Sequence, residues 1–218
     1  MIADKRAKSD YFVTMIIKPF IDPPNSASLA DMIARASRTG KGVPPVENWE
    51  PAFCGDIDME IKRDGTWFYL GTPIGRQAMV ELFATVLRKD ADGKTYLVTP
   101  VEKLGIRVED AHFIGVELDV AGTGDQQALT LRTNAGDVVD IGPDHAMRFE
   151  IEPKHNGLKP YIHTRGRLEA LASRPVMHQL MALGEEMEIG GQIMFCLRSR
   201  GIVFPVMAAD QLAQLAGL

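Results

Sequence analysis

The chain has 218 residues, which suits one large domain or two small ones, and its hydrophobic share of 45% is that of an ordinary globular protein. Its net charge of -5 argues against bulk binding to nucleic acid, which requires many clustered lysines and arginines. No stretch approaches the roughly 20 apolar residues that span a bilayer. We therefore expect a cytoplasmic protein whose partners include neither nucleic acid nor membrane.

The first part of the chain predicts an arm followed by a helix. Residues 1–25 form the expected N-terminal arm, because they end in Asp22-Pro23-Pro24-Asn25, a signal for a turn or linker. A helix is predicted over 28–37, where leucine, methionine and isoleucine make one apolar stripe. Glycines and prolines from Gly40 to Pro45 then predict an extended linker.

The next segment predicts a hairpin, a helix and further strands. Apolar residues alternate with carboxylates over 56–61, as in a half-buried strand. Asp64-Gly65 is a strong signal for a hairpin turn, and the partner strand is predicted over 66–70. A helix is expected from about Ile74 to Arg88, then a strand over 95–99 and another near Ile106, with a turn at Gly105 between the last two.

The middle and the end of the chain are predicted to be rich in strands. Three of them, over 113–120, 128–133 and 137–141, form a meander. A second hairpin is expected around Asn156-Gly157, followed by a helix from about Pro175 to Leu183. A short amphipathic helix is predicted over 208–215 at the end of the chain.

These elements indicate an internal repeat. Gly65, Tyr69 and Glu60 recur at one constant offset as Gly157, Tyr161 and Glu152. The matched turn chemistry and element order predict a duplicated strand–hairpin–helix–hairpin unit. We expect an α+β fold with antiparallel sheets, an N-terminal α+β domain over 26–111 and a C-terminal, β-rich domain with a helix over 112–218.

The spacing of residues in the sequence gives little support for a metal site or a cofactor site. The five histidines have no zinc-site spacing, and Cys54 and Cys196 are expected to be free thiols in a reducing compartment. No glycine-rich nucleotide motif occurs, and we expect no cofactor. Asp56 and Asp58 lie two apart on one face of a strand, where they are either a solvated surface or ligands for Mg²⁺ together with Glu109.

Several cations are candidates for anion binding. Arg76 is placed at the start of a helix, where the N-terminus already attracts anions and a guanidinium adds a bidentate donor. Lys103, Arg107, Arg132 and Arg165 lie near predicted strand ends and turns. Taken alone, each of these residues has the pattern of an ordinary solvated charge.

Several segments resemble the DUF1285 family of uncharacterised bacterial proteins, over about Leu29 to Pro205. The early ones are Cys54-Gly55-Asp56-Ile57-Asp58-Met59, Asp64-Gly65-Thr66-Trp67-Phe68-Tyr69 and Pro73-Ile74-Gly75-Arg76. The later ones are Thr99-Pro100-Val101-Glu102-Lys103, Arg107-Val108-Glu109-Asp110, Arg132-Thr133-Asn134-Ala135-Gly136-Asp137 and Pro160-Tyr161-Ile162-His163-Thr164-Arg165.

The resemblance implies a duplicated core with a C-terminal domain like a pleckstrin-homology fold, and a nucleotide-like ligand between the domains in signal transduction. We therefore predict a small-molecule sensor. The ligand phosphate would be bound by the cations, a polar edge would be read by Asn134, and Tyr161 would stack on a ring. The predicted ligand-binding residues are Arg76, Lys103, Arg107, Arg132, Asn134, Tyr161 and Arg165. The alternatives are a metal-dependent phosphohydrolase acting on a nucleotide through Asp56, Asp58 and Glu109, and a protein-interaction module with an exposed strand edge.

Overall fold

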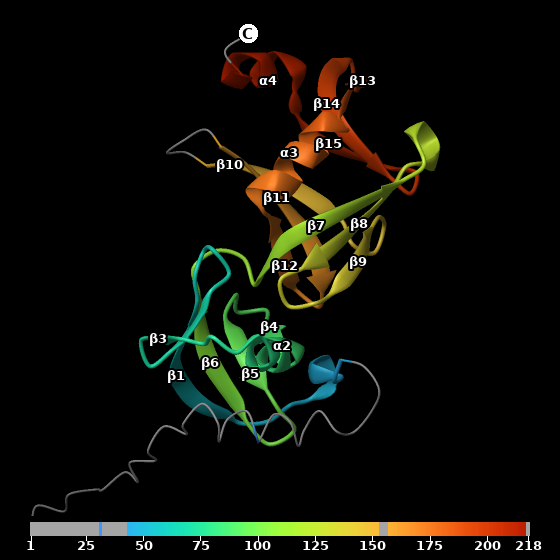
Figure 1. Ribbon diagram of the computed structural model, residues 1–218. Coiled ribbons are helices and arrows are strands. Elements are labelled where there is room, and N and C mark those ends of the chain that lie inside the picture. The colour runs from blue at the N-terminus through green and yellow to red at the C-terminus, as the bar shows by residue number, and fades with distance from the viewer. Residues whose placement is uncertain (1–30, 32–42, 153–156, 217–218) are drawn as a thin grey trace, which may run out of the picture.

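The computed structural model describes residues 43–152 and 157–216, together with Asp31 (Figure 1). The predicted N-terminal arm and, apart from Asp31, the predicted helix over 28–37 lie outside the described residues. The described chain is mostly β-sheet with few helices and forms two domains, one above the other in Figure 1, which confirms the α+β class and the two-domain arrangement. No helix of the described residues is long and apolar enough to cross a membrane.

The N-terminal domain is one six-stranded sheet with a helix. After the short 3₁₀ turn η1 (Val46–Asn48), its elements are β1 (Phe53–Ile61), β2 (Trp67–Tyr69), β3 (Thr72–Pro73), α2 (Gln77–Thr85), β4 (Leu87–Lys89), β5 (Thr95–Val98) and β6 (Lys103–Val108). The strand order is β3-β2-β1-β6-β5-β4. The helix is shorter than predicted, because the chain after Val86 pairs with β5 as strand β4.

The hairpin between β1 and β2 confirms the predicted turn at Asp64-Gly65. The side chain of Asp64 accepts a hydrogen bond from the amide of Thr66 at 2.9 Å, and Gly65 has a φ of +83°. A Cβ added to Gly65 would lie 2.6 Å from Cγ1 of Ile114 in the other domain. Glycine is therefore required here both by the backbone conformation and by the close approach of the second domain.

The C-terminal domain contains two sheets and two helices. The first sheet has the order β10-β11-β12-β7-β8-β9 and the second β13-β14-β15. The elements are β7 (Phe113–Ala121), η2 (Gly124–Gln126), β8 (Ala128–Thr133), β9 (Val138–Ile141), β10 (Met147–Glu152), β11 (Gly157–Arg165), β12 (Leu168–Ala172), α3 (Arg174–Ala182), β13 (Glu185–Ile189), β14 (Gln192–Ser199), β15 (Ile202–Ala208) and α4 (Ala209–Ala216).

A continuous apolar core joins the two domains. Trp67 and Phe83 of the first domain belong to the same buried cluster as Phe113 and Leu131 of the second. Their side chains are at most 1% exposed. Burial of such large side chains stabilises a fold by about 1.5–3 kcal/mol each, so the contact between the domains is part of the folding energy.

Part of the predicted architecture needs correction, since the sheets are not wholly antiparallel. β1 pairs with β6 in parallel, and β12 pairs with β7 in parallel. A parallel pair requires a long crossover, and here the chain from β2 to β5 supplies one. Gly105 was predicted as a turn but lies within β6, where its Cα faces Asp56 of β1. Gly157 begins β11 without a left-handed conformation, and Asn156 lies outside the described residues.

The element order supports the repeat but the sheets differ between its two copies. Three strands, a helix and three strands occur as β1–β3, α2, β4–β6 and again as β10–β12, α3, β13–β15. In the first copy all six strands share one sheet, whereas in the second the two triplets lie in different sheets. Duplication therefore remains a prediction.

Candidate functional site

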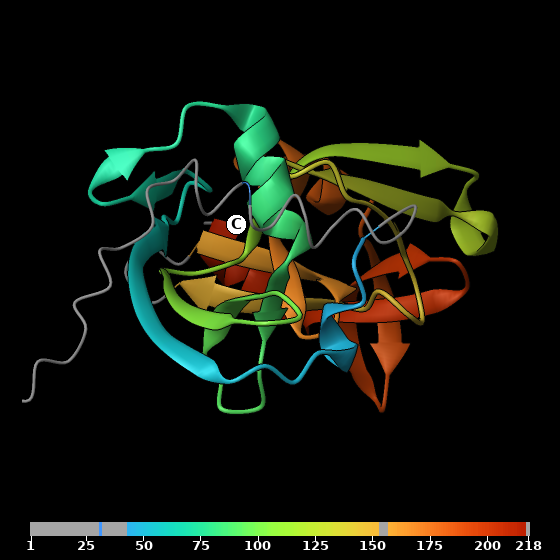
Figure 2. The ribbon, with the colours of Figure 1, turned by 90° about the horizontal axis from the view of Figure 1, so that it is seen from below.

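Helix α2 meets the C-terminal domain at its two ends (Figures 1 and 2). Near its start, Nε2 of Gln77 donates to the backbone oxygen of Asn134 at 2.7 Å. At its end, Nη2 of Arg165 donates to the backbone oxygen of Ala84 at 2.6 Å, while Nη1 lies 2.6 Å from a carboxylate oxygen of Asp137. The last carbonyls of a helix lack partners within it, so a cation at this end is favourable.

A second group of polar contacts lies elsewhere along the surface where the two domains meet, which we call the seam. The hydroxyl of Tyr161 donates to Asp110 at 2.7 Å, and the ammonium of Lys159 also donates to Asp110. Arg63 of the β1–β2 turn pairs with Glu152 of β10 at 3.0 Å. Burial opposes ionisation of Asp110, but the hydrogen bonds from Lys159 and Tyr161 outweigh it and hold its pKa below the usual value.

His112 occupies the junction between the domains. Its ring is 3% exposed, its Nδ1 accepts from the amide of Glu169, and its Nε2 lies 3.1 Å from Oγ1 of Thr95. Because Nδ1 is an acceptor, the proton must be on Nε2, which then donates to Thr95. Burial, assisted by the nearby charge of Lys89, lowers the pKa of His112 to about 4. A neutral imidazole therefore bridges strands of both domains.

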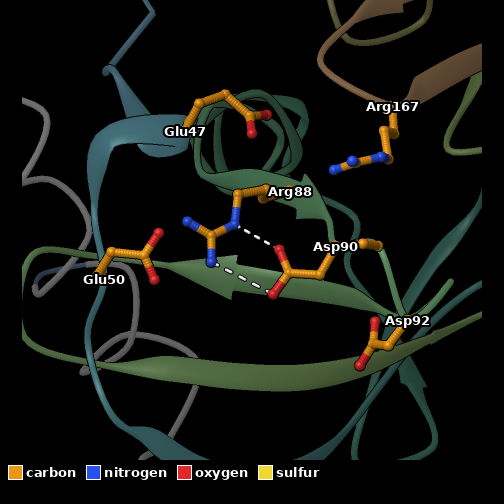
Figure 3. A pocket seen from close by; sticks show the side chains of 7 residues that line it. Glu47, Glu50, Arg88, Asp90, Asp92 and Arg167 are labelled. Atoms are coloured by element: carbon orange, nitrogen blue, oxygen red, sulfur yellow. Dashed lines mark hydrogen bonds and ion pairs between the residues drawn. The ribbon is translucent and has the colours of Figure 1, made fainter.

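An open pocket of about 460 Å³ lies where the N-terminal domain approaches the turn between β11 and β12 (Figure 3). The N-terminal domain contributes Glu47 and Glu50 from the segment around η1, Arg88 from β4, and Ala91 with the two aspartates Asp90 and Asp92 from the β4–β5 turn. The C-terminal domain contributes Arg167. We call this the interdomain pocket.

Arg88 forms the fixed wall of the interdomain pocket. It is only 5% exposed and makes hydrogen bonds from Nε and Nη2 to Asp90, while Nη1 donates to the backbone oxygens of Val46 and Trp49 (Figure 3). Burial opposes ionisation of Asp90, but the hydrogen bonds from Arg88 and Lys103 prevail and lower its pKa. Arg88 therefore donates its hydrogen bonds to protein groups, and these bonds connect the segment around η1 to the sheet.

Asp92 is held by local contacts at the edge of the pocket. It accepts a hydrogen bond from the hydroxyl of Tyr96 at 2.7 Å and another from the amide of Lys94 at 2.9 Å. These bonds lower the pKa of Asp92, and the bond to the carboxylate raises the pKa of Tyr96 to about 12. Asp92 remains ionised and exposed, so it can still accept from a ligand.

Three charged side chains of the pocket have no polar partner among the described residues. They are Glu47, Glu50 and Arg167, and all three are exposed (Figure 3). Glu47 packs so closely on Gly166 that a Cβ there would collide with its carboxylate. Within the described part of the chain, the pocket therefore presents two unpaired carboxylates from one domain and one unpaired guanidinium from the other.

The residues predicted to bind a ligand do not gather in one cleft. Lys103 pairs with Asp90 at 3.2 Å beside the ring of Tyr96, Arg107 pairs with Asp58 at 2.8 Å, and Arg132 pairs with Glu117 at 2.7 Å. None of the described residues pairs with Arg76, which lines a separate pocket of about 190 Å³ at the start of α2. Each of these three paired cations has its carboxylate partner within its own domain.

The other three predicted residues lie at the seam. Asn134 joins the domains through two contacts, since its Nδ2 approaches the oxygen of Gly65 and its backbone oxygen accepts from Gln77, while its Oδ1 accepts from the amide of Ile114 within its own domain. Tyr161 is 4% exposed, and its ring lies under the guanidinium of Arg148 at 4.1 Å. Arg165 is bound to α2 and Asp137 as described above, so all three hold the domains together.

Two of the carboxylates considered as magnesium ligands are paired with cations of the protein. Asp58 binds Arg107, while Glu109 binds the ammonium of Lys62 and the amide of Arg63. Among residues 43–152 and 157–216, no three His, Cys, Asp or Glu side chains are placed to hold a metal ion together.

The residues of the interdomain pocket were missed by the sequence reasoning. Asp92 precedes the strand predicted over 95–99, and Glu47 and Glu50 follow the predicted linker. Arg167 lies two residues after the candidate Arg165 but was not among the predicted binding residues. The available signal was local, since Asp92-Gly93 and Gly166 both mark turns where exposed polar groups project from a scaffold.

Together these features describe a two-domain α+β protein with a polar pocket between its domains. The chain belongs to the DUF1285 family. Residues 44–111 match the N-terminal domain of unknown function of that family, and residues 112–206 match the C-terminal domain of the family's proteins of unknown function. This confirms the resemblance found in the sequence.

A solved structure with high similarity agrees with this assignment. The chain is similar to the crystal structure of a DUF1285 family protein from Silicibacter pomeroyi DSS-3, with 45% sequence identity and a TM-score of 0.79, covering 87% of this chain and 98% of that one. A DUF1285 family protein from Shewanella baltica OS155 is 25% identical, with a TM-score of 0.44, over 56% of this chain and 87% of that one. A comparison with curated proteins finds no significant match.

Proposed function

We propose that this protein binds a small, nucleotide-like molecule in the interdomain pocket. The observation that carries the proposal is the set of unpaired polar groups that both domains direct into one pocket, Glu47 and Glu50 on one side and Arg167 on the other. Small-molecule sites occur preferentially at domain interfaces, in pockets of about 300–1,000 Å³. The pocket's volume of about 460 Å³ lies within that range.

The charged side chains of the interdomain pocket restrict the kinds of ligand that it can bind. Carboxylates accept hydrogen bonds from ribose hydroxyls and from the amino group of a base, so Glu47, Glu50 and Asp92 suit the nucleoside part. Arg167 can bind a phosphate through its guanidinium fork. Since three exposed carboxylates surround one free arginine, a monophosphate fits better than a di- or triphosphate.

A ligand held by both domains provides a route to signalling. A molecule that contacts Arg167 and Glu50 together would stabilise the relative domain orientation seen here, by an amount set by its differential affinity for alternative orientations. We propose that this is how binding is transmitted, in a cytoplasmic sensor. We also propose that the two halves are a duplicated unit and that the C-terminal domain is related to the pleckstrin-homology fold.

The proposal is tested by calorimetric titration and thermal shift with adenosine, AMP and ATP. AMP should raise the melting temperature by mass action, and more than ATP does. Arg167→Ala should weaken AMP binding about tenfold while leaving adenosine binding unchanged. Glu50→Gln should weaken all three ligands, whereas Glu188→Gln, at an exposed position on β13, is the matched control. No response to any nucleotide at millimolar concentration would contradict the proposal.

A further inference from the structure

A second pocket of about 480 Å³ lies within the C-terminal domain, between the β10–β11 strand pair and helix α3. Its walls include four apolar side chains, Leu158, Leu171, Ala172 and Met177. Three of these, Leu158, Leu171 and Met177, are only partly buried, so the pocket exposes aliphatic surface that the fold itself does not cover. We call it the C-terminal pocket.

The charges around this pocket do not cancel. Glu152 is neutralised by Arg63 at 3.0 Å, and Lys159 is neutralised by Asp110. Arg174 remains, in the first turn of α3, with His178 one turn later on the same face of the helix. Both are exposed, and neither has a polar partner among the described residues.

We propose that the C-terminal pocket binds an aliphatic carboxylate. The hydrocarbon chain would lie against Leu158, Leu171 and Met177, and the carboxylate would be bound by Arg174, with His178 as a second donor. A guanidinium matches a carboxylate with two parallel hydrogen bonds. The apolar part of the lining is aliphatic and, among the described residues, contains no Phe, Tyr or Trp ring for stacking, so it suits a flexible hydrocarbon chain.

The position of the pocket would couple this ligand to the seam. Glu152 and Lys159 line the pocket and are also the residues that pair with Arg63 and Asp110 between the domains. A bound chain excludes water from these pairs and strengthens them, because charges interact more strongly where water is absent. Occupancy should therefore stabilise the contact between the two domains.

Octanoate is the test ligand. Octylamine, which has the same hydrocarbon chain but the opposite charge, and acetate, which has the carboxylate without the long chain, are the controls. In calorimetry and thermal shift on the full chain, octanoate should bind and raise the melting temperature, while octylamine and acetate should not. Arg174→Ala should weaken octanoate about tenfold, since a hydrogen bond to a charged group is lost. Arg200→Ala, an exposed arginine paired with Asp140, is the matched control and should bind octanoate as the native protein does.

A second variant tests whether the hydrocarbon chain of the ligand lies in the C-terminal pocket. Gly157 lines the pocket, its backbone is not left-handed, and a Cβ added there meets no atom within 4 Å. Gly157→Leu should therefore fold normally, occupy part of the pocket and weaken octanoate. Equal binding of octanoate and octylamine, no binding of octanoate, or unchanged affinity in Arg174→Ala would each overturn the proposal. Arg174→Ala decides the question even if Gly157→Leu does not fold.

Discussion

Acidification is expected to weaken the junction between the domains through His112. The imidazole is buried with its Nδ1 accepting a hydrogen bond from the amide of Glu169, so a second proton on the ring would face an N–H donor. Lys89 and Arg165 add repulsion to a charged ring, while Glu169 partly offsets it. Protonation at this site is therefore unfavourable in the folded protein.

The size of the effect follows from the two pKa values. The pKa of His112 is about 4 in the folded protein and 6.5 in the absence of burial. Because the folded pKa is the lower one, the unfolded chain binds more protons, and stability falls as the pH drops from about 6.5 toward 4. Linkage then gives a loss of about 2.5 kcal/mol between pH 8 and about pH 4.5.

Urea denaturation at a series of pH values measures this loss, and His112→Asn isolates it. The amide oxygen of asparagine can take the acceptor role of Nδ1 but does not titrate. The native protein should lose about 2.5 kcal/mol more than the variant over this range, because all other titrating groups are common to both. Parallel curves for the two proteins would refute the reasoning.

Two further predictions concern stability. Gly65→Val should cost about 2–4 kcal/mol and lower the melting temperature, because a β-branched residue is strained at positive φ and would collide with Ile114; an unchanged melting temperature would show that the turn adapts. Arg88→Met should cost about 3 kcal/mol in chemical denaturation, because it leaves two backbone oxygens without their donor and leaves the Asp90 carboxylate with Lys103 alone. Arg107→Met, at an exposed ion pair, should change stability by less than about 1 kcal/mol, and equal costs for the two arginines would contradict this account.

Local features of the fold were predictable, and long-range pairings were not. The turn at Asp64-Gly65 depends on its own residues, so its chemistry is visible in the sequence. The end of α2 was misplaced because pairing of Leu87 with Leu97 of β5, a contact distant in sequence, decides it. The parallel pairing of β1 with β6 likewise leaves no local sign.

The residues of the candidate site also divide into those with a local signal in the sequence and those that depend on long-range contacts. Arg107 and Arg132 were candidates for anion binding, since no sequence pattern shows that Asp58 and Glu117 lie opposite them. The seam residues Asn134, Tyr161 and Arg165 were predicted to bind a ligand, and the structure shows that they bind protein groups between the domains. Arg167 escaped notice because its position in a pocket depends on the docking of two domains.

The contacts between α2 and the C-terminal domain bear on how the sequence can change over time. Gln77 donates to the main-chain oxygen of Asn134, and Arg165 donates to the main-chain oxygen of Ala84. Every residue type carries that oxygen, so the accepting position can be substituted without loss of the bond as long as the backbone is preserved. Replacing the donor at 77 or 165 removes the bond, whereas replacing the residue that supplies the main-chain oxygen does not. Related chains should therefore keep these two donors, while Asn134 and Ala84 are constrained by their own side-chain contacts and not by these bonds.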